Sequence, residues 1–270
     1  MSDFNRSAGV SRIGGAAERT TAVIDAGLRS YMLHIYNYMV LGLAITGFAA
    51  LGIYMLSVTG DAASAARSAT GATVALKNGQ FLTPLGYALF VSWLKWAVIL
   101  APLALVFVIS FGIERLRPAM AQMLFWLFAA LIGVSLASIF LVYTQTSIVR
   151  VFFITAASFG ALSLWGYTTQ RDLTGMGSFL IMGLFGVIIA SLVNLFFQSS
   201  MLQFLVSVVG VLVFAGLTAW DTQRLKNEYI YGSLDGETAE RSAIMGALSL
   251  YLNFINLFTL LLQLLGQREE

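Results

Sequence analysis

The sequence predicts an all-α integral membrane protein, a seven-transmembrane-helix bundle with the C-terminal helix central. The first observation is composition: 59% of the 270 residues are hydrophobic, only 10% are charged, and the mean hydropathy is +0.84. Soluble domains carry about 25% charged residues, so this chain has too little charge to cover an aqueous surface. The second is a series of long apolar stretches, and the third is a polar stripe in the last of them.

The apolar stretches have the length of membrane spans. A bilayer core about 30 Å thick requires roughly 20 apolar residues per helix. We expect the spans near residues 31–56, 88–113, 119–143, 148–167, 177–197, 202–221 and 243–265. The charge-free run that contains the fifth and sixth spans is too long for one helix, and the polar cluster of Gln198, Ser199 and Ser200 is expected to divide it.

The Lys and Arg residues predict the orientation. Residues 1–30, the turns 114–118 and 168–176, and the connection 222–242 carry ten of the fifteen basic residues and lie on one side of the predicted bundle. The positive-inside rule places that side in the cytosol. We therefore expect a cytosolic tail over residues 1–30, a membrane domain over 31–265 with its long loop 57–87 outside, and a short outer tail over 266–270.

Several function classes are excluded by what the sequence lacks. The net charge of +2, without a Lys- or Arg-rich run, argues against nucleic-acid binding. The absence of cysteine removes thiolate metal sites and cysteine nucleophiles. The single histidine, His34, stands near a span boundary, and no GxSG, HExxH or P-loop motif is present. We therefore expect no enzyme and no cofactor.

Two ionisable residues inside or beside the spans have ordinary explanations. Lys95 lies between Trp93 and Trp96, which is the expected composition of an interfacial aromatic belt. His34 is expected to be a hydrogen-bonded residue at the start of the first span. Asp221 differs because it follows a wholly apolar span, and a charge at membrane depth is a functional candidate. Its alternative role is an ion pair with Arg224, three residues further along the same helix.

The last span carries a stripe of polar residues along one side. The stripe consists of Ser249, Asn253, Asn256 and Gln263. These residues are 4, 3 and 7 positions apart along the chain, so they face the same side of a helix. Unsatisfied polar groups in lipid cost several kcal/mol each, so this helix should be central. The stripe can serve as hydrogen-bonding glue between helices or can line a water-filled path, and the two roles are compatible.

The depth of the polar residues adds one condition. Asn253 lies about ten residues inside the last span, or roughly 15 Å from its start. Asp221 lies near the end of the sixth span. If that helix runs on through Lys226, both side chains lie in the inner half of the bilayer and can meet.

Four passages of the sequence resemble a known family. They are "YNYMVLGLAITGFAALGIY", "VFFITAASFGALSLWGYTTQRDLTGMGSFLIMGLFGVIIASLVN", "GVLVFAGLTAWDTQRLK" and "GALSLYLNFINLF". Together they resemble the Bax-inhibitor family of membrane proteins, in its bacterial YccA-like branch. The resemblance covers most of residues 31–265, and the last two passages are the more specific. It implies a multi-pass protein of the bacterial inner membrane whose last helix is surrounded by the other six.

The resemblance also implies a passive leak of calcium or other cations through the lipid bilayer. In family members the gate is a pair of aspartates that share a proton. The first maps onto Asp221, and the second maps onto Asn253, where many members read "YLDFINLF". An Asn cannot titrate, so we hypothesise that Asp221 still latches the sixth span to the seventh, with weakened or shifted pH sensing.

Around this latch the sequence suggests accompanying roles. Arg224 is a possible latch partner, and no metal binding is expected beyond transient cation contact at Asp221. The residues expected to line the pathway are Ser249, Asn256 and Gln263.

The same branch suggests a function of a different class. It resembles proteins that associate with and modulate a membrane-anchored ATP-dependent protease. The alternative function is therefore a protein that transports nothing and regulates such a protease or another membrane partner. The tail over residues 1–30 discriminates between the two, because its deletion should abolish association and leave flux intact.

Overall fold

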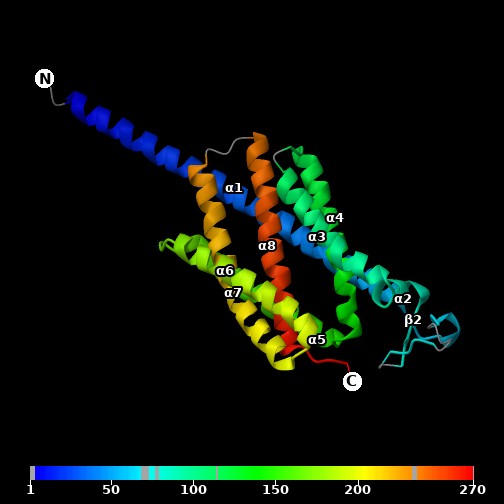
Figure 1. The fold of residues 1–270 in the computed structure, drawn as a ribbon. Coiled ribbons are helices and arrows are strands. Elements are labelled where there is room, and N and C mark those ends of the chain that lie inside the picture. Colours follow the sequence, from blue (N-terminus) through cyan, green and yellow to red (C-terminus); the bar gives the residue numbers. More distant parts are fainter. Residues whose placement is uncertain (1–3, 68–72, 77–78, 114, 233–235, 270) are drawn as a thin grey trace.

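The fold, seen in a computed structural model, is a bundle of long helices (Figure 1). The structure describes residues 4–67, 73–76, 79–113, 115–232 and 236–269, with backbone alone for 4–25. Seven helical segments within these ranges are long and apolar enough to cross a membrane: Ala26–Ser57, Leu94–Gly112, Pro118–Leu141, Gln145–Thr168, Thr174–Phe197, Ser200–Tyr231 and Gly236–Leu265. The predicted seven-span bundle is confirmed.

Short connections join the helices, except for the long segment 58–83 between α1 and α2. The α-helices are α1 (Phe4–Ser57), α2 (Pro84–Phe90), α3 (Leu94–Gly112), α4 (Pro118–Leu136), α5 (Gln145–Thr168), α6 (Thr174–Phe197), α7 (Ser200–Tyr231) and α8 (Gly236–Leu265). Two short 3-10 helices, η1 (Ala62–Ser64) and η2 (Ala137–Leu141), and two antiparallel strands, β1 (Val58–Thr59) and β2 (Phe81–Leu82), complete the described elements. The strands lie in the connection between α1 and α2.

The division between α6 and α7 falls at the predicted polar cluster. Gln198 ends α6 in the left-handed conformation, with a φ of 48°. Ser199 then begins α7, and its side chain accepts a hydrogen bond from the backbone N–H of Leu202. Such a cap satisfies one of the backbone donors that a helix start leaves unpaired. The prediction that these residues split the long apolar run is confirmed.

The expected second span, 88–113, is wrong at its start. The structure ends α2 at Phe90 and begins α3 at Leu94. Ser92 lies in the break, where its hydroxyl donates to the carbonyl of Ala88 and accepts from the N–H of Leu94. A serine that bonds to the nearby backbone in this way competes with the helical hydrogen bonds, and the apolar pattern alone does not reveal it.

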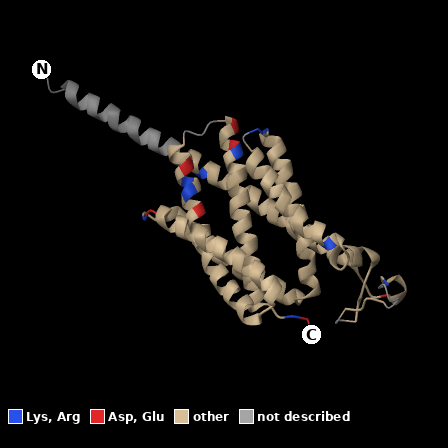
Figure 2. Cartoon of the chain, viewed as in Figure 1, with Lys and Arg blue, Asp and Glu red and all other residues tan. Residues whose placement is uncertain are grey.

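The expected long connection over residues 222–242 is also wrong. α7 continues through Tyr231 and α8 begins at Gly236, so most of that segment is helical. The charged residues of this segment therefore lie on helix ends beyond the apolar stretch. Figure 2 shows Lys, Arg, Asp and Glu gathered mainly toward the ends of the helices.

The C-terminal helix is the most buried of the seven spans. Half of its most apolar window is buried, compared with 11% for α3. α8 packs against α1, α4, α5 and α7, whereas α3 packs mainly on α4 and α6 on α7 (Figure 1). The central position of α8 is confirmed, with four helices rather than six forming its main surroundings.

A buried hydroxyl pair ties α8 to α1 and α4. The fully buried Tyr251 of α8 shares a hydrogen bond of 2.7 Å with the hydroxyl of Thr46 on α1. The Thr46 hydroxyl also lies 2.9 Å from the carbonyl oxygens of Gly42 and Ala129. This contact joins three helices at one point in the core.

Small residues bring the helices together elsewhere. On α5, Gly166 lies so close to α7 that an added Cβ would be 2.2 Å from the carbonyl oxygen of Ala219. On α4, Gly133 lies against the backbone of Thr46, with an added Cβ 2.5 Å from its carbonyl oxygen. Close approach at small residues is how membrane helices pack without a hydrophobic driving force. The Gly166 contact sets the position of α7 two residues before Asp221.

Candidate functional site between α7 and α8

The site is built around one buried carboxylate. The Asp221 side chain is 5% exposed and lies between α7 and α8. Its Oδ2 accepts hydrogen bonds from Ser249 Oγ at 2.8 Å and Asn253 Nδ2 at 2.7 Å. Its Oδ1 forms an ion pair with Arg224 Nη2 at 2.8 Å. Four of the residues singled out from the sequence therefore meet, and we refer to them as the latch.

The latch has a buried side and an exposed side. Arg224 is 46% exposed, whereas Asp221 is almost fully covered. The guanidinium also lies over the ring of Trp220, 5.2 Å from its centroid. The buried carboxylate is thus paired with a more exposed cation, which lowers the cost of burying it.

A cavity of about 330 Å³ adjoins the latch on its exposed side. It lies between α3, α7 and α8, and its polar lining consists of Ser110, Arg224, Glu228, Ser242 and Ser249. Ser242 donates a 2.6 Å hydrogen bond to Glu228 across the two helices. The cavity extends from the charged end of the bundle to two latch residues, Arg224 and Ser249. We call it the inner vestibule because the sequence predicts this end to be cytosolic.

The residues after Asp221 connect α7 to its other neighbours. Thr222 shares a 2.9 Å hydrogen bond with Ser163 of α5, and Lys226 donates to the carbonyl of Tyr167 at 2.9 Å. Gln223 accepts from the N–H of Leu173 and donates to the carbonyl of Arg171, bonds that hold the connection between α5 and α6. Sequence reasoning did not single out Thr222 or Gln223.

A second polar cluster lies toward the opposite end of the contact between α7 and α8, which we call the α7–α8 seam. Gln263 Oε1 accepts hydrogen bonds from Gln203 Nε2 at 3.0 Å and from Ser207 Oγ at 2.8 Å. Gln203 Oε1 in turn accepts from Asn194 Nδ2 of α6 at 3.2 Å. A cavity of about 660 Å³, the outer vestibule, is lined by these four side chains and by Arg268.

An apolar segment separates the two vestibules along α7 and α8. It consists of a buried cluster with members from α6, α7 and α8: Leu180, Val187, Val213, Phe214, Leu217, Leu257 and Leu260. Asn253 and Gln263 are ten residues apart, or roughly 15 Å along the helix. We call this cluster the plug, because in the described structure it fills the seam between the polar groups at its two ends.

The predicted stripe of α8 therefore divides among three places. Ser249 and Asn253 bind Asp221, Gln263 belongs to the outer vestibule, and Asn256 donates to the carbonyl of Leu252 on its own helix. The side-chain amides form hydrogen bonds between helices at each end of the seam. Asn256 lies apart from the latch and lines neither vestibule.

The two ionisable residues with ordinary explanations lie away from the latch. His34 is exposed on α1 and meets the ring of Tyr38 edge-on, with 4.6 Å between centroids. Lys95 is the second residue of α3, and its Nζ lies 5.6 Å from the ring centroid of Trp96. Of the expected protease-binding tail over residues 1–30, the side chains of residues 1–25 lie outside the described residues.

The described residues bring no three His, Cys, Asp or Glu side chains together in a group that could hold a metal ion. At the latch a cation would meet one carboxylate, with the Ser249 hydroxyl and the Asn253 amide carbonyl as further oxygen ligands. Hard cations such as calcium take six to eight oxygens. The donor set fits passing contact and is too small for a resident ion.

Comparison with known proteins places the chain in a family. Residues 28–270 match the family described as inhibitor of apoptosis-promoting Bax1. The chain belongs to this family. An inner membrane protein of Escherichia coli, YbhL, is 44% identical over 246 residues, which cover 90% of this chain and 94% of YbhL.

Other bacterial relatives extend over the same length. An uncharacterized protein of Rickettsia prowazekii is 44% identical over 246 residues, covering 91% of this chain and 93% of the relative. One from Caulobacter vibrioides is 42% identical over 270 residues and covers both chains completely. The match of the Bax-inhibitor family begins within the first span and includes every residue of the latch. The family resemblance of the sequence is confirmed, and the chain is a multi-pass membrane protein.

Proposed function

We propose that this protein is a passive cation-leak channel of the bacterial inner membrane, permeable to calcium and gated by the latch between α7 and α8. The observation that carries the proposal is the buried Asp221 carboxylate, held by groups from both helices. A charge at membrane depth is costly and marks ion pathways in many membrane proteins. The name of YbhL as an inner membrane protein supports the location.

The arrangement along the seam supports a closed gate. Polar vestibules lie at both ends, and the plug of leucine, valine and phenylalanine side chains lies between them. A hydrophobic constriction excludes water and therefore ions. Parting α7 from α8 would hydrate the plug and join the two vestibules, and the latch opposes that movement because it binds one helix to the other.

The pH sensing of this latch is expected to be weakened or shifted. Asn253 cannot titrate, so the latch lacks the second carboxylate of a pair that shares a proton.

The test is calcium flux from reconstituted liposomes at pH 6 to 8, comparing wild type with Asp221→Asn. The amide imitates the protonated carboxylate and leaves Arg224 without its counter-ion. We expect the variant to leak about tenfold faster at pH 8, as the loss of one charge-assisted hydrogen bond implies.

Arg224→Gln serves as the companion variant, since it removes the ion pair and retains the carboxylate. It should raise the flux. Liposomes that show no calcium flux above the protein-free background with any of the three proteins would overturn the proposed function.

A further inference from the structure

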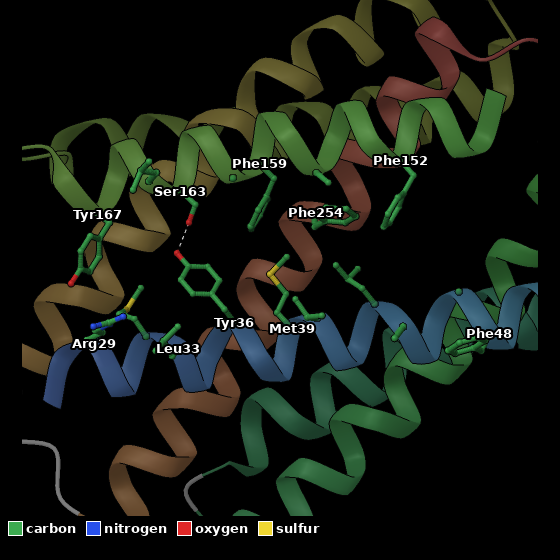
Figure 3. Close-up of a pocket in the computed structure, with 18 of the residues that line it drawn as sticks. Arg29, Leu33, Tyr36, Met39, Phe48, Phe152, Phe159, Ser163, Tyr167 and Phe254 are labelled. Carbon is green, nitrogen blue, oxygen red and sulfur yellow. Dashed lines mark hydrogen bonds between the residues drawn. The ribbon is translucent and has the colours of Figure 1, made fainter. Parts of the chain in front are cut away.

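A long groove runs between α1 and α5, away from the α7–α8 seam (Figure 3). Its volume is about 1070 Å³, slightly above the usual range of ligand pockets, about 300–1,000 Å³. Arg29 to Leu51 of α1 and Phe152 to Tyr167 of α5 supply its walls, and Phe254 adds a contact from α8. None of the four latch residues lines it.

The middle of the groove is a surface for hydrocarbon. Its lining there is leucine, methionine, valine, phenylalanine, alanine and glycine, with two hydroxyl groups from Tyr36 and Ser163. These hydroxyls bond to each other, as Figure 3 shows, and Ser163 also bonds to Thr222. The polar groups inside the groove are therefore satisfied by the protein, which favours an apolar occupant.

One end of the groove carries positive charge. Arg29 and Tyr167 both lie at this end in Figure 3. Arg29 is exposed, and among the residues whose side chains are described no carboxylate forms an ion pair with it. Lys226 Nζ lies 5.3 Å from the centroid of the Tyr167 ring. An arginine with a lysine and a tyrosine nearby is the composition that binds headgroups at the membrane surface.

We propose that this groove is a binding site for one membrane phospholipid with an anionic headgroup. The acyl chain lies along α1 and α5, and the headgroup phosphate binds the guanidinium of Arg29, which can donate two parallel hydrogen bonds to it.

The dimensions agree with this occupant. From Phe152 to Tyr167 the α5 wall rises about 22 Å, more than half of a bilayer core about 30 Å thick. A chain that begins in the leaflet at the Arg29 end therefore stays inside the groove. Binding of the lipid does not depend on whether the protein conducts ions.

Two glycines allow the groove to be filled without disturbing the helices. A Cβ added at Gly47 or Gly160 would meet no atom within 4 Å, and both residues line the groove. The variant Gly47→Leu/Gly160→Leu should occupy the space of the acyl chain. Gly52→Leu/Gly186→Leu is the matched control, because a Cβ at either position also meets nothing within 4 Å and neither residue lines the groove.

Native mass spectrometry of the purified full chain in uncharged detergent measures the occupancy. The probes are dioleoylphosphatidylglycerol, which is anionic, and dioleoylphosphatidylcholine, which is zwitterionic. We expect wild type and the control to retain one phosphatidylglycerol, with about fivefold preference over phosphatidylcholine. The filled variant should bind about tenfold more weakly, and Arg29→Gln should bind both lipids equally.

Three results would overturn the proposal. The first is undiminished phosphatidylglycerol binding by the filled variant, and the second is an equal loss in the Gly52→Leu/Gly186→Leu control. The third is a dimer that the filled variant alone fails to form, which would assign the groove to a second copy of the chain.

Discussion

The two oxygens of Asp221 bind three side chains from two helices. The arginine is on the same helix as the carboxylate, whereas the serine and the amide come from α8. Removing either α8 donor weakens the connection between the helices at the latch, and removing Asp221 removes both of these hydrogen bonds. The latch therefore depends on this carboxylate, while further hydrogen bonds join α7 to α8 at the two vestibules.

Asn253→Asp should give the latch a second titrating group. Two carboxylates at hydrogen-bonding distance cannot both ionise cheaply, so the pair would share a proton and titrate as a unit. Loss of that proton sets two negative charges against each other. We expect calcium flux from liposomes to rise with pH in this variant and to depend on pH more steeply than in wild type.

The comparison needs a control for the change of side chain alone. Asn253→Ala removes the amide donor without adding a charge, so it should leak faster and should not gain the steeper pH dependence. If Asn253→Asp and wild type give the same flux profile from pH 6 to 8, Asp221 and position 253 do not form a latch.

The sequence predicted part of the latch. Arg224 follows Asp221 at the spacing of a helical ion pair, and the resemblance to the family's aspartate pair places Asn253 against Asp221. Ser249 was predicted only to line the pathway, although it lies one helical turn before Asn253. The roles of Thr222 and Gln223 could not be predicted in the same way. Each bonds to a neighbour that is distant in sequence, Ser163 and the connection after α5, and only the packing of α5 on α7 brings them together.

At the scale of elements, the α7–α8 seam is held in place by close packing of α5 on α7. Gly166 allows this approach, because a Cβ there would come within 2.2 Å of the Ala219 carbonyl oxygen. The sequence does not reveal which glycine lies against which backbone, since that depends on the rotation of each helix about its axis.

Gly166→Ala should destabilise the protein by about 1–3 kcal/mol, the usual cost of forcing an extra group into a packed contact. Thermal unfolding in detergent micelles measures this loss of stability. Gly160→Ala on the same helix is the control, because a Cβ there meets nothing within 4 Å, and it should be neutral or slightly stabilising. Equal melting temperatures for the two variants would show that the α5–α7 contact is looser than described.

The element boundaries show where apolar patterning is informative. It located all seven spans, and the polar cluster at 198–200 marked the division of α6 from α7. It failed at Ser92, where one side chain interrupts the helix, and beyond Asp221, where α7 continues as a polar helix. Hydropathy reports where lipid begins and ends, and a helix that extends into water gives no such signal.

At the scale of the whole molecule, the distribution of basic residues predicts a direction in the membrane. The end of the bundle at the α7–α8 connection carries the greater number of Lys and Arg residues, so the positive-inside rule places it in the cytosol. We therefore expect the short C-terminal segment to lie on the outer side.

Single cysteines can test this orientation because the chain has none of its own. Gly232 follows α7, Gln267 follows α8, and both are exposed. In intact spheroplasts, a membrane-impermeant maleimide should label Gln267→Cys, and it should label Gly232→Cys only after permeabilisation. The reverse labelling pattern would show that the protein has the opposite orientation, with the inner vestibule on the outer side of the membrane.

In the proposed mechanism, cations pass between α7 and α8 only when the two helices part. Gly210 of α7 lies against Leu260 of α8, where an added Cβ would be 2.7 Å from the leucine Cδ1. A short bis-methanethiosulfonate reagent, which forms a disulfide with each thiol and releases methanesulfinate, can link Gly210→Cys to Leu260→Cys across the plug. The matched control links Gly183→Cys to Val213→Cys, a contact between α6 and α7.

The deciding measurement is calcium flux from liposomes before cross-linking, after it, and after reduction. Linking α7 to α8 should lower the flux about tenfold or more, reduction should restore it, and the α6–α7 link should leave it unchanged. Undiminished flux through protein in which the α7–α8 cross-link is shown to be complete would contradict a pathway that opens between the last two helices.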